Sequence, residues 1–149
     1  EAQNVERVIS KGLELQLQAT VAFNKIESQW GANYSYNPVK EHNKQKQLIY
    51  TPKHSANLYA DLNWKKYGIT ADGSYIGERT QILQGQSLPG HFLTNLSLRY
   101  RLNYKEHGLQ FTAQMLNIFD IDYQNEALYA MPGRAFKLNI SIDLRNEGR

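Results

Sequence analysis

Apolar and polar residues alternate one by one along much of the chain. In the first such stretch Leu13, Leu15 and Leu17 are apolar, and the residues between them are polar. A period of two places successive side chains on opposite faces of a β-strand, whereas an α-helix would spread them around its surface. The chain is therefore predicted to be all-β. Six segments of about ten residues carry the pattern, namely 12–23, 56–64, 69–75, 92–102, 109–115 and 136–144.

Long and short connections alternate between these six segments, which predicts an antiparallel up-and-down meander. The connections near residues 65–68 and 103–108 are short, whereas 24–55, 77–91 and 116–133 are long and rich in Gly, Pro, Asn and charge. Short turns at one end and long loops at the other are typical of outer-membrane β-barrels. An additional hairpin built from residues 28–36 and 44–50 would raise the number of strands to eight.

The lengths of the segments also favour a membrane-spanning wall. A barrel strand crosses a bilayer with about 9–11 residues, whereas strands of soluble proteins average about 5–6 residues. In such a wall the apolar side chains face lipid and the polar ones face the lumen. The expected lipid-facing set is Leu13, Leu15, Leu17, Leu58, Leu62, Leu96, Leu98, Phe111, Leu138, Ile140 and Ile142. The expected lumen-facing set is Gln16, Asn57, Asp61, Asn95, Arg99, Gln110, Thr112, Asn139 and Ser141.

Aromatic residues flank both short connections. Trp64 and Tyr67 lie beside the first, and Tyr100 and Tyr104 lie beside the second. Trp and Tyr are enriched at membrane–water interfaces, where the ring is in the apolar zone and the polar tip faces water. These four residues are therefore predicted to be interface aromatics; the alternative is that they close hairpins by cross-strand packing.

Composition removes several classes of function. The 149 residues carry a formal net charge of +3, which is too mild for a nucleic-acid partner. The absence of Cys excludes disulfides, Cys-zinc sites and thiol nucleophiles. No recognised catalytic or phosphate-binding motif occurs, and the four His residues are not spaced as metal ligands. We therefore expect no enzyme activity, no cofactor and no metal site.

The last third of the chain resembles a known family. Residues 117–123 read Asn-Ile-Phe-Asp-Ile-Asp-Tyr, and residues 129–134 read Tyr-Ala-Met-Pro-Gly-Arg. Together they resemble the C-terminal signature of TonB-dependent outer-membrane receptors, with Ile118 where Leu is usual. Three further stretches resemble strand entries of that family: 12–14 (Gly-Leu-Glu), 51–55 (Thr-Pro-Lys-His-Ser) and 88–92 (Leu-Pro-Gly-His-Phe). The signature residues are Asn117, Phe119, Asp120, Tyr123, Pro132, Gly133 and Arg134.

The resemblance implies a bacterial outer-membrane barrel of about 22 strands that encloses an N-terminal plug. The whole chain, residues 1–149, would be the C-terminal segment of that barrel and supply its last six strands, without the plug. The implied function is uptake of a scarce large nutrient such as a ferric siderophore. The implied partners are outer-membrane lipid, the N-terminal strands and plug of the same receptor, and a TonB-type energising protein that acts through the plug.

Ligand capture is expected in the long connections, which would be extracellular loops. The stretches 31–51 and 77–91 combine Tyr, Arg and Lys, which suit an anionic, aromatic iron chelate; contact with lipopolysaccharide phosphates is the alternative. The candidates for ligand binding are Tyr34, Tyr36, Lys40, Lys44, Arg79 and Gln81.

Two other functions remain open on the sequence. One is a complete, small eight-stranded outer-membrane barrel with a structural or adhesive role. The other is a soluble lipocalin-like carrier, in which the apolar parity would face inward around a hydrophobic ligand.

Overall fold

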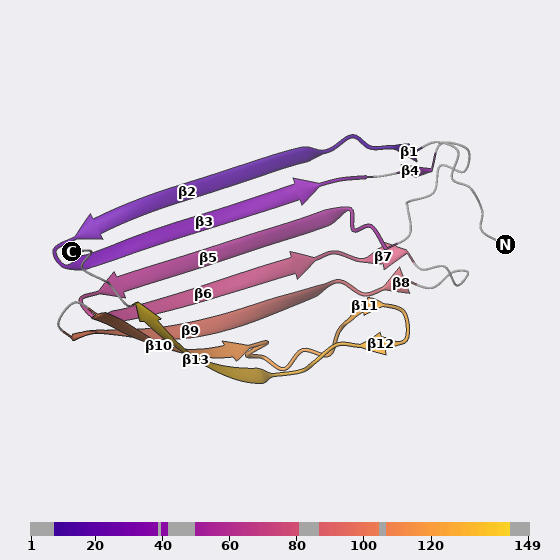
Figure 1. Cartoon of the computed structure of the whole chain (residues 1–149). Helices are drawn as coiled ribbons and strands as arrows, with labels where there is room; N and C mark the ends of the chain where they lie inside the picture. The colour runs from indigo at the N-terminus through magenta and orange to yellow at the C-terminus, as the bar shows by residue number, and fades with distance from the viewer. Residues whose placement is uncertain (1–7, 39, 42–49, 81–86, 105–106, 144–149) are drawn as a thin grey trace, which may run out of the picture.

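In the computed structural model the chain forms one long antiparallel sheet with smaller strand pairs at one end (Figure 1). The structure describes residues 8–38, 40–41, 50–80, 87–104 and 107–143, of which 8, 9, 40, 41 and 104 are described by their backbone alone. No helix occurs among the described residues, so the all-β prediction is confirmed. The main strands are β2 (Leu13–Phe23), β3 (Ile26–Tyr36), β5 (His54–Trp64), β6 (Tyr67–Ile76), β9 (His91–Tyr104), β10 (His107–Leu116) and β13 (Ala135–Asp143).

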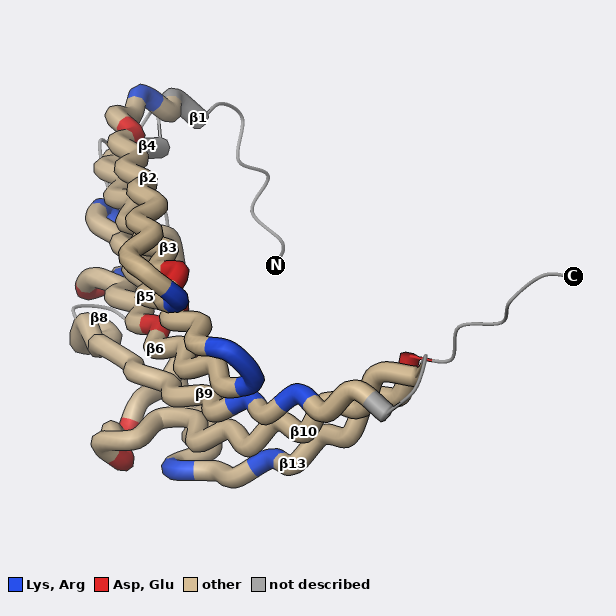
Figure 2. Tube along the Cα trace, turned by 90° about the vertical axis from the view of Figure 1, so that its left-hand side faces the viewer, with Lys and Arg blue, Asp and Glu red and all other residues tan. Residues whose placement is uncertain are grey.

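The seven main strands lie side by side in chain order, as β13-β10-β9-β6-β5-β3-β2. Every neighbouring pair is antiparallel, and the register runs without a bulge along each pair. The up-and-down meander is therefore confirmed. The sheet is curved, and β10 and β13 bend away from the direction followed by β2 and β3 (Figure 2).

Strand β3 is the one long strand that the six-segment pattern missed. Its positions on the apolar parity are Ile26, Ser28, Trp30, Ala32, Tyr34 and Tyr36, in which aromatic and small residues replace the leucines of the other strands. The prediction of one long connection over 24–55 was therefore wrong. Strand β3 pairs along its whole length with β2 and β5, and the long connection covers only residues 37–53. Most of segment 44–50, the second half of the suggested extra hairpin, lies outside the described residues.

Tight two-residue turns join the strands at one end of the sheet. Asn24 and Lys65 begin two of these turns with φ of 54° and 53°, the left-handed backbone that two-residue hairpins need. The β9–β10 hairpin turns at the same end, and the long connections gather at the opposite end (Figure 1). Three short strand pairs form there: β1 (Val8–Ile9) with β4 (Lys40–Glu41), β7 (Arg79–Thr80) with β8 (Ser87–Leu88), and β11 (Gln124–Glu126) with β12 (Tyr129–Ala130).

The register divides the main sheet into one apolar and one polar face. Directly paired residues share a face, so one row runs Leu138, Ala113, Leu98, Ile69 and Leu62 across five strands. Following the pairs confirms that all eleven residues predicted to face lipid lie on this same face, and that the nine polar ones lie on the other.

The apolar face is uncovered. Leu17 is 73% exposed, Leu138 is 87% exposed, and among the described residues Leu88 is the only buried apolar side chain. In water this surface would be far larger than the apolar patches that soluble monomers expose.

Candidate functional site

Near the tight turns, an aromatic row crosses the apolar face. Trp64, Tyr67 and Tyr100 are direct cross-strand partners on β5, β6 and β9. The ring centroids of Trp64 and Tyr67 are 6.0 Å apart, and those of Tyr67 and Tyr100 are 5.3 Å apart. The Nζ atom of Lys65 lies 4.9 Å from the Trp64 ring centroid. We call Trp64, Tyr67 and Tyr100 the turn-side belt. The fourth predicted interface aromatic, Tyr104, ends β9, and its side chain lies outside the described part.

A second aromatic group crosses the same face at the other end of the strands. The hydroxyl of Tyr34 is hydrogen-bonded to Nδ1 of His54 at 2.7 Å, and the rings of Tyr36 and His54 are 5.0 Å apart. Tyr75 and Phe92 are direct partners one row further into the sheet. These five residues form what we call the loop-side belt. The sequence contains its signal, since aromatic residues occupy alternate positions at the end of β3, but that strand was not recognised.

The ligand candidates fall in different environments. Tyr34 and Tyr36 are in β3, so their assignment to a loop was wrong; the strand continues to Tyr36 because both of its edges are paired. Lys40 lies opposite Ile9 in the β1–β4 pair. Lys44 and Gln81 lie outside the described residues.

The remaining candidate, Arg79, is buried where two long connections meet. It is 4% exposed, and its Nη1 and Nη2 atoms donate to the backbone carbonyls of Asn125 and Gln124 at 3.2 and 2.8 Å. Burial lowers the pKa of this guanidinium from its ordinary value. The rings of His91 and Tyr123 lie nearby, with centroids 4.7 Å apart and planes tilted by 41°. Arg79 therefore ties connection 77–90 to connection 117–134.

The signature residue Asn117 closes the turn that follows β10. It is 5% exposed with φ of 48°. Its Nδ2 donates to the carbonyl of Ile121, and its Oδ1 accepts from the Ile121 N–H, both at 2.9 Å. Its own N–H donates to Oδ1 of Asn95 at 3.0 Å. An amide side chain is needed here because it must donate and accept at once.

Asp120 and Gly133 explain the spacing between the two halves of the signature. The N–H of Arg134 donates to Oδ1 of Asp120 at 2.6 Å. A Cβ atom at Gly133 would lie 2.7 Å from the same oxygen, so only glycine fits without movement. Tyr123 accepts a hydrogen bond from the N–H of Met131 through its carbonyl. Phe119 is 64% exposed. The signature therefore holds together the connection that returns the chain from β10 to β13.

The polar face carries an ion-pair network near the tight turns. Nη2 of Arg99 lies 2.6 Å from Oδ2 of Asp61, and it also donates to Oδ1 of Asn63 at 3.1 Å. Thr70 donates to Asp61 at 2.7 Å. Gly68 lies beneath this group, and a Cβ there would come within 2.8 Å of the Arg99 Nε atom. The glycine leaves the space through which Arg99 reaches across β6.

Neither a metal-binding cluster nor a membrane-spanning helix occurs in the described part of the chain. Its side chains include no group of three or more His, Cys, Asp or Glu that could hold a metal ion. It also contains no helix of sufficient length and hydropathy to span a membrane.

A family model described as TonB dependent receptor-like, beta-barrel, matches residues 1–118. The matched range includes β2 to β10 and ends at the second residue of the connection that begins with Asn117. No curated protein matches the chain in sequence.

Proposed function

Because the chain belongs to the TonB-dependent receptor β-barrel family, we propose that its sheet is part of the wall of an outer-membrane receptor that takes up a scarce large nutrient. Receptors of this family lie in the bacterial outer membrane and transport nutrients rather than catalyse covalent chemistry. In this proposal residues 1–149 are a C-terminal segment of the barrel, and the apolar face contacts lipid.

The observation that carries the proposal is the uncovered apolar face between two aromatic belts. In β6 the belts are marked by Tyr67 and Tyr75, eight residues apart. At about 3.4 Å per residue this is about 27 Å along the strand, which at a strand tilt of about 35–45° spans about 19–22 Å of the membrane normal, somewhat less than the ~25 Å apolar band of outer-membrane barrels. The same separation would have no purpose in a soluble lipocalin-like carrier, whose apolar side chains fill an interior.

The edges of the sheet support the proposal that further strands complete the wall. Within the described residues, β2 and β13 each have a main-sheet neighbour on one side only. An unpaired strand edge in hydrocarbon costs several kcal/mol per unsatisfied backbone group. We therefore assign the missing neighbours to other strands of the same receptor. The polar face would then look toward the lumen, where a plug acted on by a TonB-type protein would lie.

For the ligand we propose an anionic iron chelate such as a ferric siderophore, captured at the long-connection end. Lys40 and Lys44 are cationic residues of connection 37–53 and suit such a ligand. Tyr34 and Tyr36 would border the site, Gln81 would extend it, and Arg79 would support it by holding two connections together. Uptake of radiolabelled iron chelates by cells that carry Lys40→Gln and Lys44→Gln tests this choice; reduced uptake of anionic but not neutral chelates is expected.

The membrane orientation is testable because the chain has no Cys. Single substitutions Leu128→Cys, Lys65→Cys, Ser97→Cys and Leu98→Cys would be labelled in intact cells, with the unsubstituted receptor as background. We expect an impermeant maleimide to label position 128 from outside, and position 65 only after the outer membrane is permeabilised. A small water-soluble maleimide should label position 97 and not position 98, because a thiol that faces hydrocarbon stays protonated and unreactive.

Two results would contradict the proposal. One is labelling of position 98 by the impermeant reagent in intact membranes. The other is recovery of the protein in the soluble fraction without detergent, which would favour the carrier. Labelling as expected with a strand count of eight would favour the small complete barrel.

A further inference from the structure

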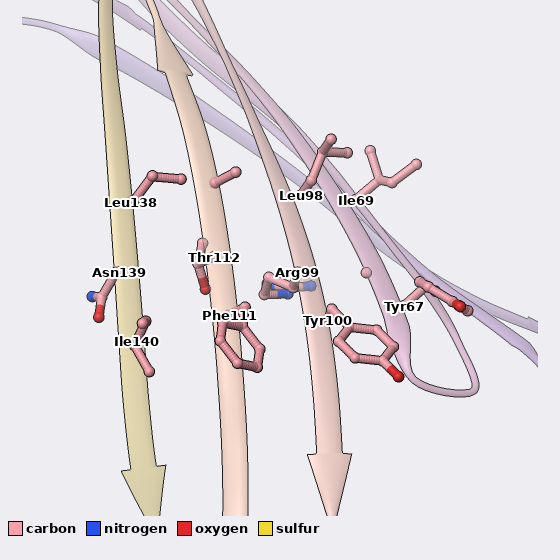
Figure 3. Close-up of a pocket in the computed structure, with 12 residues that line it drawn as sticks. Tyr67, Ile69, Leu98, Arg99, Tyr100, Phe111, Thr112, Leu138, Asn139 and Ile140 are labelled. Atoms are coloured by element: carbon pink, nitrogen blue, oxygen red, sulfur yellow. The ribbon is translucent and has the colours of Figure 1, made fainter.

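A groove of about 550 Å³ crosses the apolar face between β6 and β13. Most of its lining side chains are apolar and come from four strands, as Figure 3 shows for Ile69, Leu98, Phe111, Leu138 and Ile140, and Arg99, Thr112 and Asn139 also border it. Its volume is within the ~300–1,000 Å³ range of small-molecule sites. The inference drawn from this groove rests on the proposed membrane orientation.

The groove exists because one small residue interrupts a row of large ones. Ala113 on β10 pairs directly with Leu98 on one side and Leu138 on the other. In the next row toward the tight turns, Phe111 lies between Tyr100 and Ile140. The methyl group of Ala113 is too short to fill the space between these larger neighbours, so a hollow remains.

The end of the groove nearest the tight turns is amphipathic, and a cationic turn adjoins it. Tyr67 and Tyr100 of the turn-side belt line it. The Lys65–Lys66 turn adjoins Tyr67, and the carbonyl of Lys66 accepts from the N–H of Arg101 at 2.8 Å, which fixes the turn against β9. The described main-strand positions on the apolar face include no carboxylate, because all five carboxylates of these strands lie on the polar face: Glu14, Glu27, Asp61, Asp72 and Asp143. Among the described residues, the charge that adjoins this end of the apolar face is therefore that of Lys65 and Lys66, and the Lys65 side chain extends over the Trp64 ring.

We propose that this groove holds one acyl chain of an anionic glycerophospholipid, with the phosphate beside Lys65 and Lys66. A hydrocarbon chain suits the apolar walls, and the phenol groups of Tyr67 and Tyr100 suit the glycerol–phosphate level, where amphipathic rings gather. The lysines supply the charge complement, since lipid phosphates attract cationic residues at the membrane surface. A lipid in this groove would be retained by the receptor, whereas the lipids around the rest of the wall would exchange.

Lipid retention in the full receptor tests the proposal. The receptor would be purified from outer membranes, exchanged into lipid-free detergent, and examined by native mass spectrometry and lipid extraction. We expect the unsubstituted receptor to retain about one phospholipid, enriched in phosphatidylglycerol or cardiolipin over phosphatidylethanolamine. Ala113→Phe should fill the hollow and lower retention at least threefold. Ala19→Phe, on the same face in β2, should leave it unchanged.

A second variant, in which Gln replaces both Lys65 and Lys66, tests the contact with the lipid headgroup. It leaves the groove walls intact. It should abolish the preference for anionic lipid, and it remains informative if Ala113→Phe fails to assemble. Equal retention by Ala113→Phe and Ala19→Phe would overturn the proposal, as would loss of all phospholipid from the unsubstituted receptor or a bound peptide instead of lipid. The cysteine labelling described above is independent of these results, so failure of the lipid site and failure of the membrane orientation are distinguishable.

Discussion

Arg99 and Asp61 form an ion pair across an intervening strand, with Nη2 and Oδ2 2.6 Å apart. The two residues belong to β9 and β5, and β6 passes between them. The guanidinium can lie flat over β6 because Gly68 has no side chain at the crossing point. Three strands are thus joined on the polar face by one contact as well as by their backbone ladders.

This arrangement predicts a dependence of the ion pair on the glycine. Gly68→Val should displace Arg99 and destabilise the receptor by about 1–3 kcal/mol through overpacking. A double-mutant cycle on Arg99→Ala and Asp61→Ala should give a coupling of about 1 kcal/mol in the parent, the upper end for partly exposed pairs, and almost none in the Gly68→Val background. The measurement is urea unfolding of receptor folded into vesicles. Unchanged coupling in that background would show that the glycine does not control the pair.

Charge substitutions on adjacent residues of β9 should have unequal effects. Leu98 lies on the apolar face two residues from Tyr100, so Leu98→Arg should cost about 2 kcal/mol, the lower part of the midplane range. Ser97 lies on the polar face in register with Gln114 and Thr70. Ser97→Arg loses the hydrogen bond that Ser97 Oγ accepts from Gln114 Nε2, so it should cost about 1 kcal/mol at most. Unfolding in vesicles measures both, and equal costs would show that the two faces have similar surroundings.

Gly31 and Tyr59 make a second glycine-dependent contact on the polar face. They are direct partners on β3 and β5, and a Cβ at Gly31 would collide with the Tyr59 ring. Gly31→Ala should therefore destabilise by about 1–2 kcal/mol, although alanine normally improves on glycine in a strand. In a Tyr59→Ala background the same change should be neutral or stabilising. The reversal of sign, measured by thermal unfolding in detergent, is the diagnostic result; a loss of equal size in both backgrounds would assign the effect to the backbone.

Two residues of the signature should respond differently to truncation. Asn117→Ala removes two hydrogen bonds to Ile121 and places alanine at φ of 48°, which should cost about 2–3 kcal/mol. Asn117→Gly loses the same bonds without the strain and should cost about 1 kcal/mol less. Phe119→Ala should change little because the ring is exposed. Hydrogen exchange of the amides in connection 117–134 reports the loss locally. Equal protection in all three variants would show that the Asn117 side chain does not hold this connection together.

The alternation of residue types determined six of the seven main strands and the face to which each of their side chains belongs, and the alternating lengths of the connections determined the meander. Trp64, Tyr67 and Tyr100 could be assigned to a common belt from the sequence because they lie near short turns. Near a short turn, few residues are available as cross-strand partners. The motif around Asn117 was sufficient for the family resemblance. Each of these inferences depends on local sequence, since period two fixes a side chain's face whatever its neighbours are.

Only the tertiary structure decided which residues meet across strands. Strand β3 was overlooked because Ser28 and Ala32 weaken its alternation, and pairing with β2 and β5 then moved Tyr34 and Tyr36 from a predicted loop to the loop-side belt. Arg79 was expected to be available to a ligand, but two carbonyls from residues 124 and 125 hold it. Gly68 beneath Arg99, Gly31 beneath Tyr59 and the hollow at Ala113 likewise follow from register. Strand register brings together residues that are tens of positions apart in the sequence. The local alternation of polar and apolar residues does not specify which residues these are.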